Sequence, residues 1–200
     1  MIRRASGRLR GRAGMTLSEL LIVLIILGFV TAILAAGLPT AIGAYRKISD
    51  AANAQVLLST TMTRLRTELG TATELEVPEG GGAEIRYRNS SGSMACIYGD
   101  YREDGGTEPG LVIVNYAPDQ AITRSEASRP VRLTVKDWQD REMYPYFSGV
   151  AYDRASGVVT ITGLSVRVTE AGGTERTVLT LADPDDSSDM AFEVRVLLPA

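Results

Sequence analysis

A single carboxylate, Glu19, lies near the start of a long apolar segment, and it is the side chain most open to a chemical interpretation. The local sequence is Gly14-Met15-Thr16-Leu17-Ser18-Glu19-Leu20, and the next charged residue is Arg46. A charged side chain at the centre of a membrane helix costs about 2.5–3.5 kcal/mol, and less near the end of the helix. A lone carboxylate at this place therefore needs a cationic partner or a function.

Other kinds of chemistry have little support in the sequence. The chain has no histidine, which removes the commonest general base and the commonest transition-metal ligand. Its one cysteine, Cys96, excludes an internal disulfide and is interpreted as a small buried apolar side chain. No glycine-rich phosphate loop of the P-loop or Rossmann type occurs. We therefore expect neither an enzyme nor a required cofactor.

One acidic loop is a weak candidate for calcium binding. It contains Asp183, Asp185, Asp186 and Asp189 together with two serines. Calcium takes six to eight oxygen ligands, and such a loop could supply several of them. The spacing does not match an EF-hand, because the fixed glycine and the distal glutamate are missing. A solvated turn is the favoured interpretation, so the sequence predicts no metal site.

Two further clusters are interpreted as structural. The charged loop from Gly99 to Gly106 is expected to be a surface turn. The aromatic cluster Tyr144-Pro145-Tyr146-Phe147, with Trp138 nearby, is expected in a sheet core or at a sheet edge rather than on a partner-binding surface.

The element that must position Glu19 is a membrane helix. The segment Leu20–Tyr45 has no charged residue and, at about 1.5 Å per residue, is long enough to cross a hydrocarbon core of about 30 Å. Residues 1–14 contain five of the chain's 21 basic residues and no acid. A basic flank stays cytoplasmic, so the following domain is expected outside. The rest of the chain is acidic, which does not indicate nucleic-acid binding.

The helical pattern continues beyond the apolar segment. Apolar residues recur at steps of three or four, which places them on one helical face: Ile48, Ala51, Ala54, Leu58, Met62, Leu65 and Leu69. Gly70 is a plausible helix stop. One helix is therefore predicted from near Met15 to near Leu69, bent around Pro39. Its first half is apolar all round, and its second half is amphipathic and suited to pack on a sheet.

Beyond Glu79-Gly80-Gly81-Gly82 the pattern is that of short strands. Expected strands lie at 83–88, 94–98, 111–114, 131–136, 146–152, 158–162, 164–169, 176–181 and 192–198. Two hairpins are expected, with turns at 153–157 and 170–175. The predicted fold class is α+β, a long N-terminal helix packed on an antiparallel sheet domain. The predicted segments are a leader at 1–14, a transmembrane and assembly helix at 15–44, its amphipathic continuation at 45–70, and an extracytoplasmic domain at 80–200.

The pattern from Gly14 to Glu19 resembles the class III signal of type IV pilins and pseudopilins, the subunits of thin filaments. In that family a membrane-embedded prepilin peptidase cuts after a glycine, and the fifth residue of the mature chain is a glutamate. Gly14 and Glu19 match these positions, and Met15 would be the new first residue. Met15 differs from the usual phenylalanine, and Ser18 differs from the commoner isoleucine.

The resemblance covers roughly residues 8–69 and implies roles for particular residues. It implies cleavage between Gly14 and Met15, N-methylation of Met15, and guidance of filament assembly by Glu19. In the family, the glutamate is proposed to pair with the α-amino group of a neighbouring subunit. Gly28 matches a recurrent helix glycine, and Pro39 lies later than the usual helix proline; both are assigned to helix packing and bending.

The implied function is a structural subunit, a minor pilin or a pseudopilin, of a type IV pilin-like filament. The implied partners are prepilin peptidase, other pilins or pseudopilins, an inner-membrane assembly platform, and membrane lipid before assembly. The subunit would be a single-pass protein of the cytoplasmic membrane, and then part of a filament at the cell surface or in the periplasm. Such filaments serve in adhesion, motility, type II secretion and competence for DNA uptake, and the sequence does not select among these.

An alternative interpretation is a secreted or signal-anchored extracytoplasmic β domain with a binding role. A secretory signal peptide also has a basic start, an apolar stretch and small residues before its cleavage point, and Ala35-Ala36-Gly37 fits the last feature. Against this interpretation stand the carboxylate of Glu19, the junction at Gly14, and an apolar stretch longer than the usual 7–15 residues.

Overall fold

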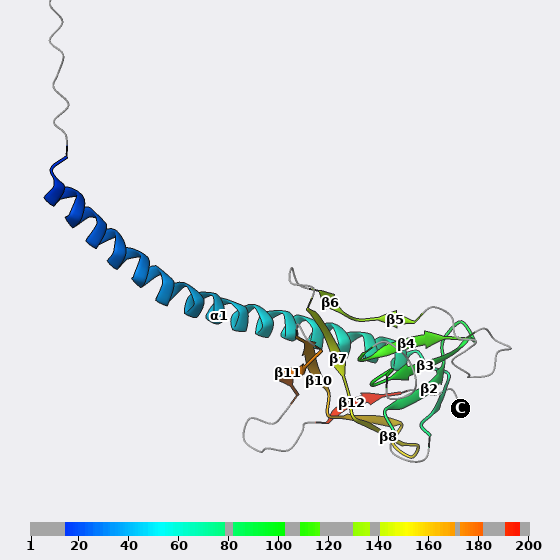
Figure 1. Ribbon diagram of the computed structural model, residues 1–200. Coiled ribbons are helices and arrows are strands. Elements are labelled where there is room, and N and C mark those ends of the chain that lie inside the picture. Colours follow the sequence, from blue (N-terminus) through cyan, green and yellow to red (C-terminus); the bar gives the residue numbers. More distant parts are fainter. Residues whose placement is uncertain are drawn as a thin grey trace, which may run out of the picture. The chain divides into compact units, whose positions relative to one another are not determined.

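The computed structural model describes residues 15–78, 82–102, 109–116, 130–136, 141–170, 173–181 and 191–196. The chain divides into two compact units, Met1–Lys47 and Ile48–Ala200. Within the described residues, one long helix, α1, is followed by twelve short strands, and every strand pair is antiparallel (Figure 1). The fold is therefore α+β, as the sequence predicts.

Helix α1 spans Leu17–Gly70 and passes through Pro39 without interruption. The predicted end of the helix at Gly70 is confirmed, whereas a bend at Pro39 stays a prediction. In the described part of the chain, α1 is the one helix long and apolar enough to cross a membrane. Its most apolar window has a mean hydropathy of 2.9 and is 0% buried. The apolar side chains of this stretch therefore have no cover from the described part of the chain.

The second half of α1 packs on the domain by a face that differs partly from the predicted one. The buried residues of the helix are Asp50, Ala54, Leu57, Leu58, Thr61, Leu65 and Leu69. Ile48 is 70% exposed and Ala51 is also exposed, although the apolar periodicity places both on the packed face. The buried face instead begins at Asp50, a charged residue that an apolar pattern does not select.

Three sheets make up the β part. The first has the order β1-β2-β3-β4-β5, and its strands are β1 Glu74–Glu76, β2 Glu84–Arg88, β3 Met94–Tyr98, β4 Val112–Asn115 and β5 Val131–Arg132. The second has the order β11-β10-β7-β6, with β6 Val135–Lys136, β7 Glu142–Tyr146, β10 Ser165–Thr169 and β11 Glu175–Thr180. The third has the order β12-β9-β8, with β8 Gly149–Asp153, β9 Val158–Thr162 and β12 Phe192–Arg195.

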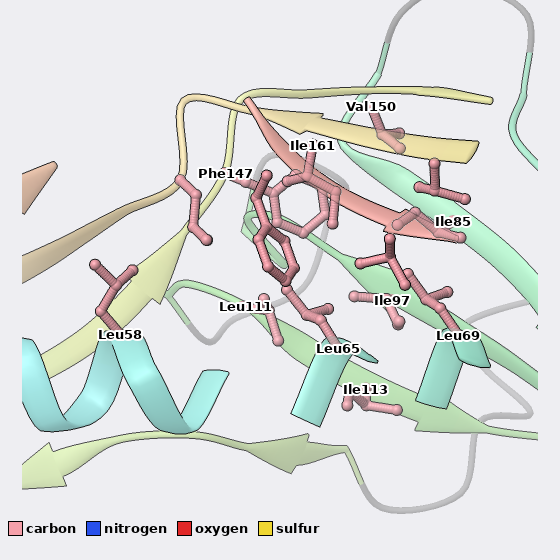
Figure 2. Close-up of a cluster of buried hydrophobic side chains, with 14 of the residues drawn as sticks. Leu58, Leu65, Leu69, Ile85, Ile97, Leu111, Ile113, Phe147, Val150 and Ile161 are labelled. Carbon is pink, nitrogen blue, oxygen red and sulfur yellow. The ribbon is translucent and has the colours of Figure 1, made fainter. Parts of the chain in front are cut away.

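The main core lies where α1 meets the sheets. Leu58, Leu65 and Leu69 project from the helix toward apolar side chains of the strands (Figure 2). The strand side of this cluster includes Ile85, Ile97, Ile113, Phe147 and Ile161. Leu65 and Leu69 are 0% exposed, so the helix is an integral part of the domain core from there to its end.

The first sheet is covered on both faces. On β3, Ala95 and Ile97 belong to the main core, whereas the alternating Cys96 and Tyr98 belong to a second buried cluster. The neighbouring β4 divides in the same way and is buried at Val112, Ile113 and Val114, as the continuous apolar run predicts. The Cys96 thiol is 0% exposed, and burial raises its pKa. Its interpretation as a small buried side chain is confirmed.

The predicted hairpins are confirmed, but the strand boundaries differ at two places. Residues 131–136 were predicted as one strand and instead form β5 and β6, which belong to different sheets. Residues 146–152 were also predicted as one strand, but β7 ends at Tyr146 and β8 begins at Gly149 in another sheet. At each place the chain changes sheet within two residues, which an apolar pattern does not record.

Two strands escaped prediction. β1 is short and carries two glutamates, and β7 contains Pro145, a residue that normally argues against an interior strand. Pro145 is nevertheless paired with Val166 on β10, and its carbonyl accepts the N–H of Leu111 at 2.7 Å. Because the N–H and C=O of one strand residue point to the same side, the missing N–H of Pro145 would face Leu111 rather than β10, so the β7–β10 ladder loses no hydrogen bond.

Candidate functional site

The first turn of α1 is closed by reciprocal contacts between Thr16 and Glu19. The backbone N–H of Thr16 and its Oγ1 hydroxyl each donate to Glu19 Oε2 at 2.9 Å. The backbone N–H of Glu19 points back to Thr16 Oγ1 at 3.3 Å. Thr16 stands directly before the helix, and Glu19 is its third residue. This is the capping-box arrangement, which satisfies backbone donors that have no partner inside the helix.

The sequence analysis missed the role of Thr16, although the signal was present. A Thr-x-x-Glu spacing before an apolar run is the usual signature of a capping box. Ser18 Oγ lies 3.1 Å from Thr16 Oγ1 and adds a further polar contact to this turn. The lone carboxylate therefore has a partner within its own chain. Among the described residues, both hydrogen bonds that Glu19 accepts end at Oε2, so Oε1 is left for another donor.

The surroundings of this turn are apolar and exposed. Met15 is 63% exposed and Leu17 is 84% exposed. The large hydrophobic side chains continue exposed as far as Ile48. Glu19 is therefore the one carboxylate on this exposed apolar part of the helix. The hydrophobic effect disfavours leaving such a surface in water, so it is expected to be buried in lipid or against other chains.

The other predicted positions lie apart from this turn. Gly14, the residue before the predicted cleavage, and the calcium-candidate loop at Asp183–Asp189 lie outside the described residues. Gly28 and Pro39 both lie inside α1. A side chain built at Gly28 would meet no described atom within 4 Å, so the chain itself imposes no need for glycine there. The described residues contain no group of three or more metal-ligating side chains.

The aromatic cluster is part of the fold rather than a binding surface. Tyr144 and Phe147 are 0% exposed, and burial raises the pKa of Tyr144 to about 12. The guanidinium of Arg102 lies 6.0 Å from the centre of the Tyr144 ring and forms an ion pair with Glu175. The hydrogen bond from Arg102 holds the pKa of Glu175 below its ordinary value.

The described start of the charged loop after β3, Gly99–Arg102, is less exposed than predicted, and residues 103–106 lie outside the described residues. Asp100 is 3% exposed, and its Oδ1 accepts the backbone N–H groups of Arg102 and Gly110, both at 3.2 Å. Gly110 has a φ of +83°, which favours glycine, and a Cβ there would come within 2.4 Å of the Tyr144 ring. Asp100 therefore ties this loop together, which explains a buried carboxylate without a ligand.

Comparison with known proteins adds one match, at the N-terminus. Residues 9–35 match the family model of the prokaryotic N-terminal methylation motif, the class III signal of type IV pilins. No curated protein and no solved structure matches the chain. The motif implies processing by prepilin peptidase and assembly with other pilins, and it points to a structural subunit rather than an enzyme. With the apolar helix, it supports a single-pass, membrane-anchored protein.

Proposed function

We propose that this type IV pilin-like protein is a minor pilin or pseudopilin, cleaved between Gly14 and Met15 and N-methylated on Met15. The methylation motif at residues 9–35 is the observation that carries the proposal. The exposure of the apolar helix that follows Glu19, with no other charge before Arg46, also supports it. Residues 80–200 form the extracytoplasmic domain in this proposal, and the basic residues of 1–14 keep the leader in the cytoplasm.

In this proposal, Glu19 guides assembly by gaining a second partner. Before assembly, the carboxylate is held by Thr16 through its Oε2 atom. Cleavage creates a positive α-amino group on Met15, and N-methylation of this amine keeps its charge. In a filament core without water, a carboxylate has to be paired. The Oε1 atom is then the acceptor for the α-amino group of a neighbouring subunit, which would set the register between subunits.

The exposed apolar helix also accounts for the proposed contacts with lipid, with other pilins or pseudopilins, and with an assembly platform. The segment 15–44 holds the subunit in the membrane before assembly and joins other pilins or pseudopilins afterwards. Gly28 allows close approach of a neighbouring helix, because no described atom occupies the space beside it. An inner-membrane platform would move the subunit from the membrane into the filament.

Mass spectrometry of the mature N-terminus tests the proposal. The expected N-terminal peptide begins with N-methylated Met15 in cells that contain the peptidase, and it retains the leader in cells that lack it. A Gly14→Val variant should accumulate as the uncleaved precursor, because a branched side chain obstructs the extended backbone at the cut. A mature chain that begins after Ala36 or Gly37 would instead support the secreted β domain and overturn the pilin-like function.

A further inference from the structure

The first buried residue of α1 is a carboxylate. In the described chain from Met15 to Asn53, every side chain except Asp50 is exposed or half-buried. Asp50 is 5% exposed, and it lies just inside the compact unit that begins at Ile48. The apolar contacts of the helix with the domain start later, at Ala54 and Leu57. The first residue of the helix to be buried against the domain is therefore the charged Asp50.

Two arginines from distant parts of the chain, one just before a strand and one on a strand, bind this carboxylate. Arg141, directly before β7, places Nη2 at 2.9 Å from Asp50 Oδ1 and Nη1 at 3.4 Å from Oδ2. Arg176, on β11, places Nη2 at 3.1 Å from Asp50 Oδ2. Both lie far from the helix in the sequence; Arg176 belongs to the second sheet, and Arg141 adjoins its strand β7. The two-point contact of Arg141 fixes both distance and direction, which a single contact does not.

A fourth residue closes the network. Glu170 Oε1 lies 3.3 Å from Arg176 Nη2, and Glu170 Oε2 lies 3.8 Å from Arg141 Nη1. Glu170 also begins the turn between β10 and β11, where its backbone N–H donates to the Thr174 carbonyl at 2.8 Å. Two acids thus face two arginines, which compensates the charge of the buried carboxylate. These four residues, Asp50, Glu170, Arg141 and Arg176, are called the Asp50 latch below.

We infer that the Asp50 latch holds α1 on the second sheet at the place where the helix joins the domain, so that the helix stays docked when the subunit is pulled from the membrane. This inference rests on the proposed function, because it is assembly that pulls on the apolar half of α1. Asp50 is a positioning residue in this process.

Physical reasons favour a charged contact at this place. Apolar burial is non-directional, and Ala51, Ala52 and Asn53 offer little apolar area. The first docked turn would therefore open easily, as element ends with few buried contacts do. A buried charge pair differs, because separating it leaves an uncompensated charge, which is strongly unfavourable. The latch thus resists opening at the end of the docked segment, where a pull would act first.

Hydrogen exchange of the full-length protein in detergent micelles tests the latch without any filament. The variant Arg176→Gln removes the ion pair between Arg176 and Asp50 and leaves the Arg141–Asp50 contact, so the domain should still fold. The matched control is Arg64→Gln. Arg64 and Arg176 have side chains that are 49% exposed, and Arg64 forms a helix-surface pair with Glu68 at 2.6 Å. Asp50→Asn, which keeps the shape and removes the charge, serves as the stronger second variant.

The expected result is a local one. Exchange of the backbone amides in 50–57 should rise by about fivefold or more in Arg176→Gln and further in Asp50→Asn, while β3 keeps its protection and Arg64→Gln leaves 50–57 unchanged. Unchanged exchange at 50–57, or an equal rise throughout the domain, would overturn the latch. If Asp50→Asn unfolds globally, exchange in Arg176→Gln alone tests the latch.

Filament incorporation tests the part of the inference that concerns pulling. At equal membrane levels, Arg176→Gln should reduce the fraction of subunits recovered in sheared filaments, and Arg64→Gln should not. Equal incorporation of the two variants would overturn the role in extraction. A failure of the proposed function is recognised separately, because it changes the mature N-terminus of the wild-type protein and leaves the exchange measurement as it is.

Discussion

Glu19 is the residue on which the assembly proposal is most directly tested. Glu19→Ala should leave cleavage largely intact, because Gly14 and Met15 are unchanged, but it should impair incorporation into filaments. Glu19→Asp should be milder, since it keeps the charge and shortens the reach. Shearing followed by immunoblotting measures both, with the cleaved wild type as reference. Normal incorporation of Glu19→Ala would show that this carboxylate does not determine assembly.

A substitution at Thr16 tests the capping of the helix while the charge of Glu19 is kept. Thr16→Ala removes the hydroxyl that contacts both the carboxylate and the backbone of Glu19, and loss of such a cap costs about 1 kcal/mol. The first turn of α1 should therefore fray, as measured by amide exchange at Leu17–Leu20 in micelles. Thr16→Ser keeps the hydroxyl and is the control. Equal exchange in the Ala and Ser variants would contradict the capping role.

Glu175 predicts a pH dependence of stability. Its folded-state pKa is lowered by the hydrogen bond from Arg102, so its contribution is present above the unfolded pKa of about 4.3 and is lost as the pH falls through the folded pKa. Glu175→Gln should lower the free energy of unfolding at pH 7 by about 1 kcal/mol or less, because the pair is partly exposed. Unfolding curves across pH should converge in acid; a constant difference at all pH values would argue against this pair.

At the scale of elements, α1 should behave as part of the domain core along one face only. Leu65→Ala removes a side chain that is 0% exposed and should lower the free energy of unfolding by about 2–5 kcal/mol. Val56→Ala, on the same helix but 66% exposed, should change it little. Urea unfolding in micelles, followed by near-ultraviolet circular dichroism, compares the two. Similar losses for both variants would contradict the packed face.

At the scale of the whole molecule, the proposed topology has the N-terminus inside and the β part outside. Protease added to spheroplasts should therefore digest residues after 80 and leave the membrane helix protected. Lysed cells give the reference for full digestion, and a cytoplasmic marker confirms intact spheroplasts. Protection of the β part in intact spheroplasts from cells without filaments would contradict this orientation.

Much of this molecule could be predicted from local patterns, and the limits have physical causes. Apolar periodicity located α1 and most strands, since period and burial are linked directly. It placed Ile48 on the packed face and passed over Asp50, because the contact at Asp50 depends on Arg141 and Arg176, which are distant in the sequence. It also missed β7, where Pro145 is tolerated because its position for an N–H faces away from the neighbouring strand β10.

The sequence singles out the carboxylate of the candidate site but does not give its contacts. The lone position of Glu19 singled it out, and the family resemblance supplied a neighbouring amine as its partner. The contact with Thr16 within the same chain was overlooked, although its spacing was visible. The sequence shows that no other charged residue lies near Glu19. The bonds from the hydroxyl and the backbone N–H of Thr16 become evident only in the folded first turn of the helix.

Because Cys96 is buried, introduced cysteines can be labelled selectively in the otherwise wild-type protein. Its thiol is 0% exposed, lies 3.4 Å from Glu84 Oε1, and has a raised pKa, so little reactive thiolate is present at neutral pH. A maleimide reagent should therefore leave the folded protein unlabelled and react only after denaturation. Spin labels or fluorophores can then be attached to single introduced cysteines, for example at the exposed Ser91 or Ala151, without first replacing Cys96.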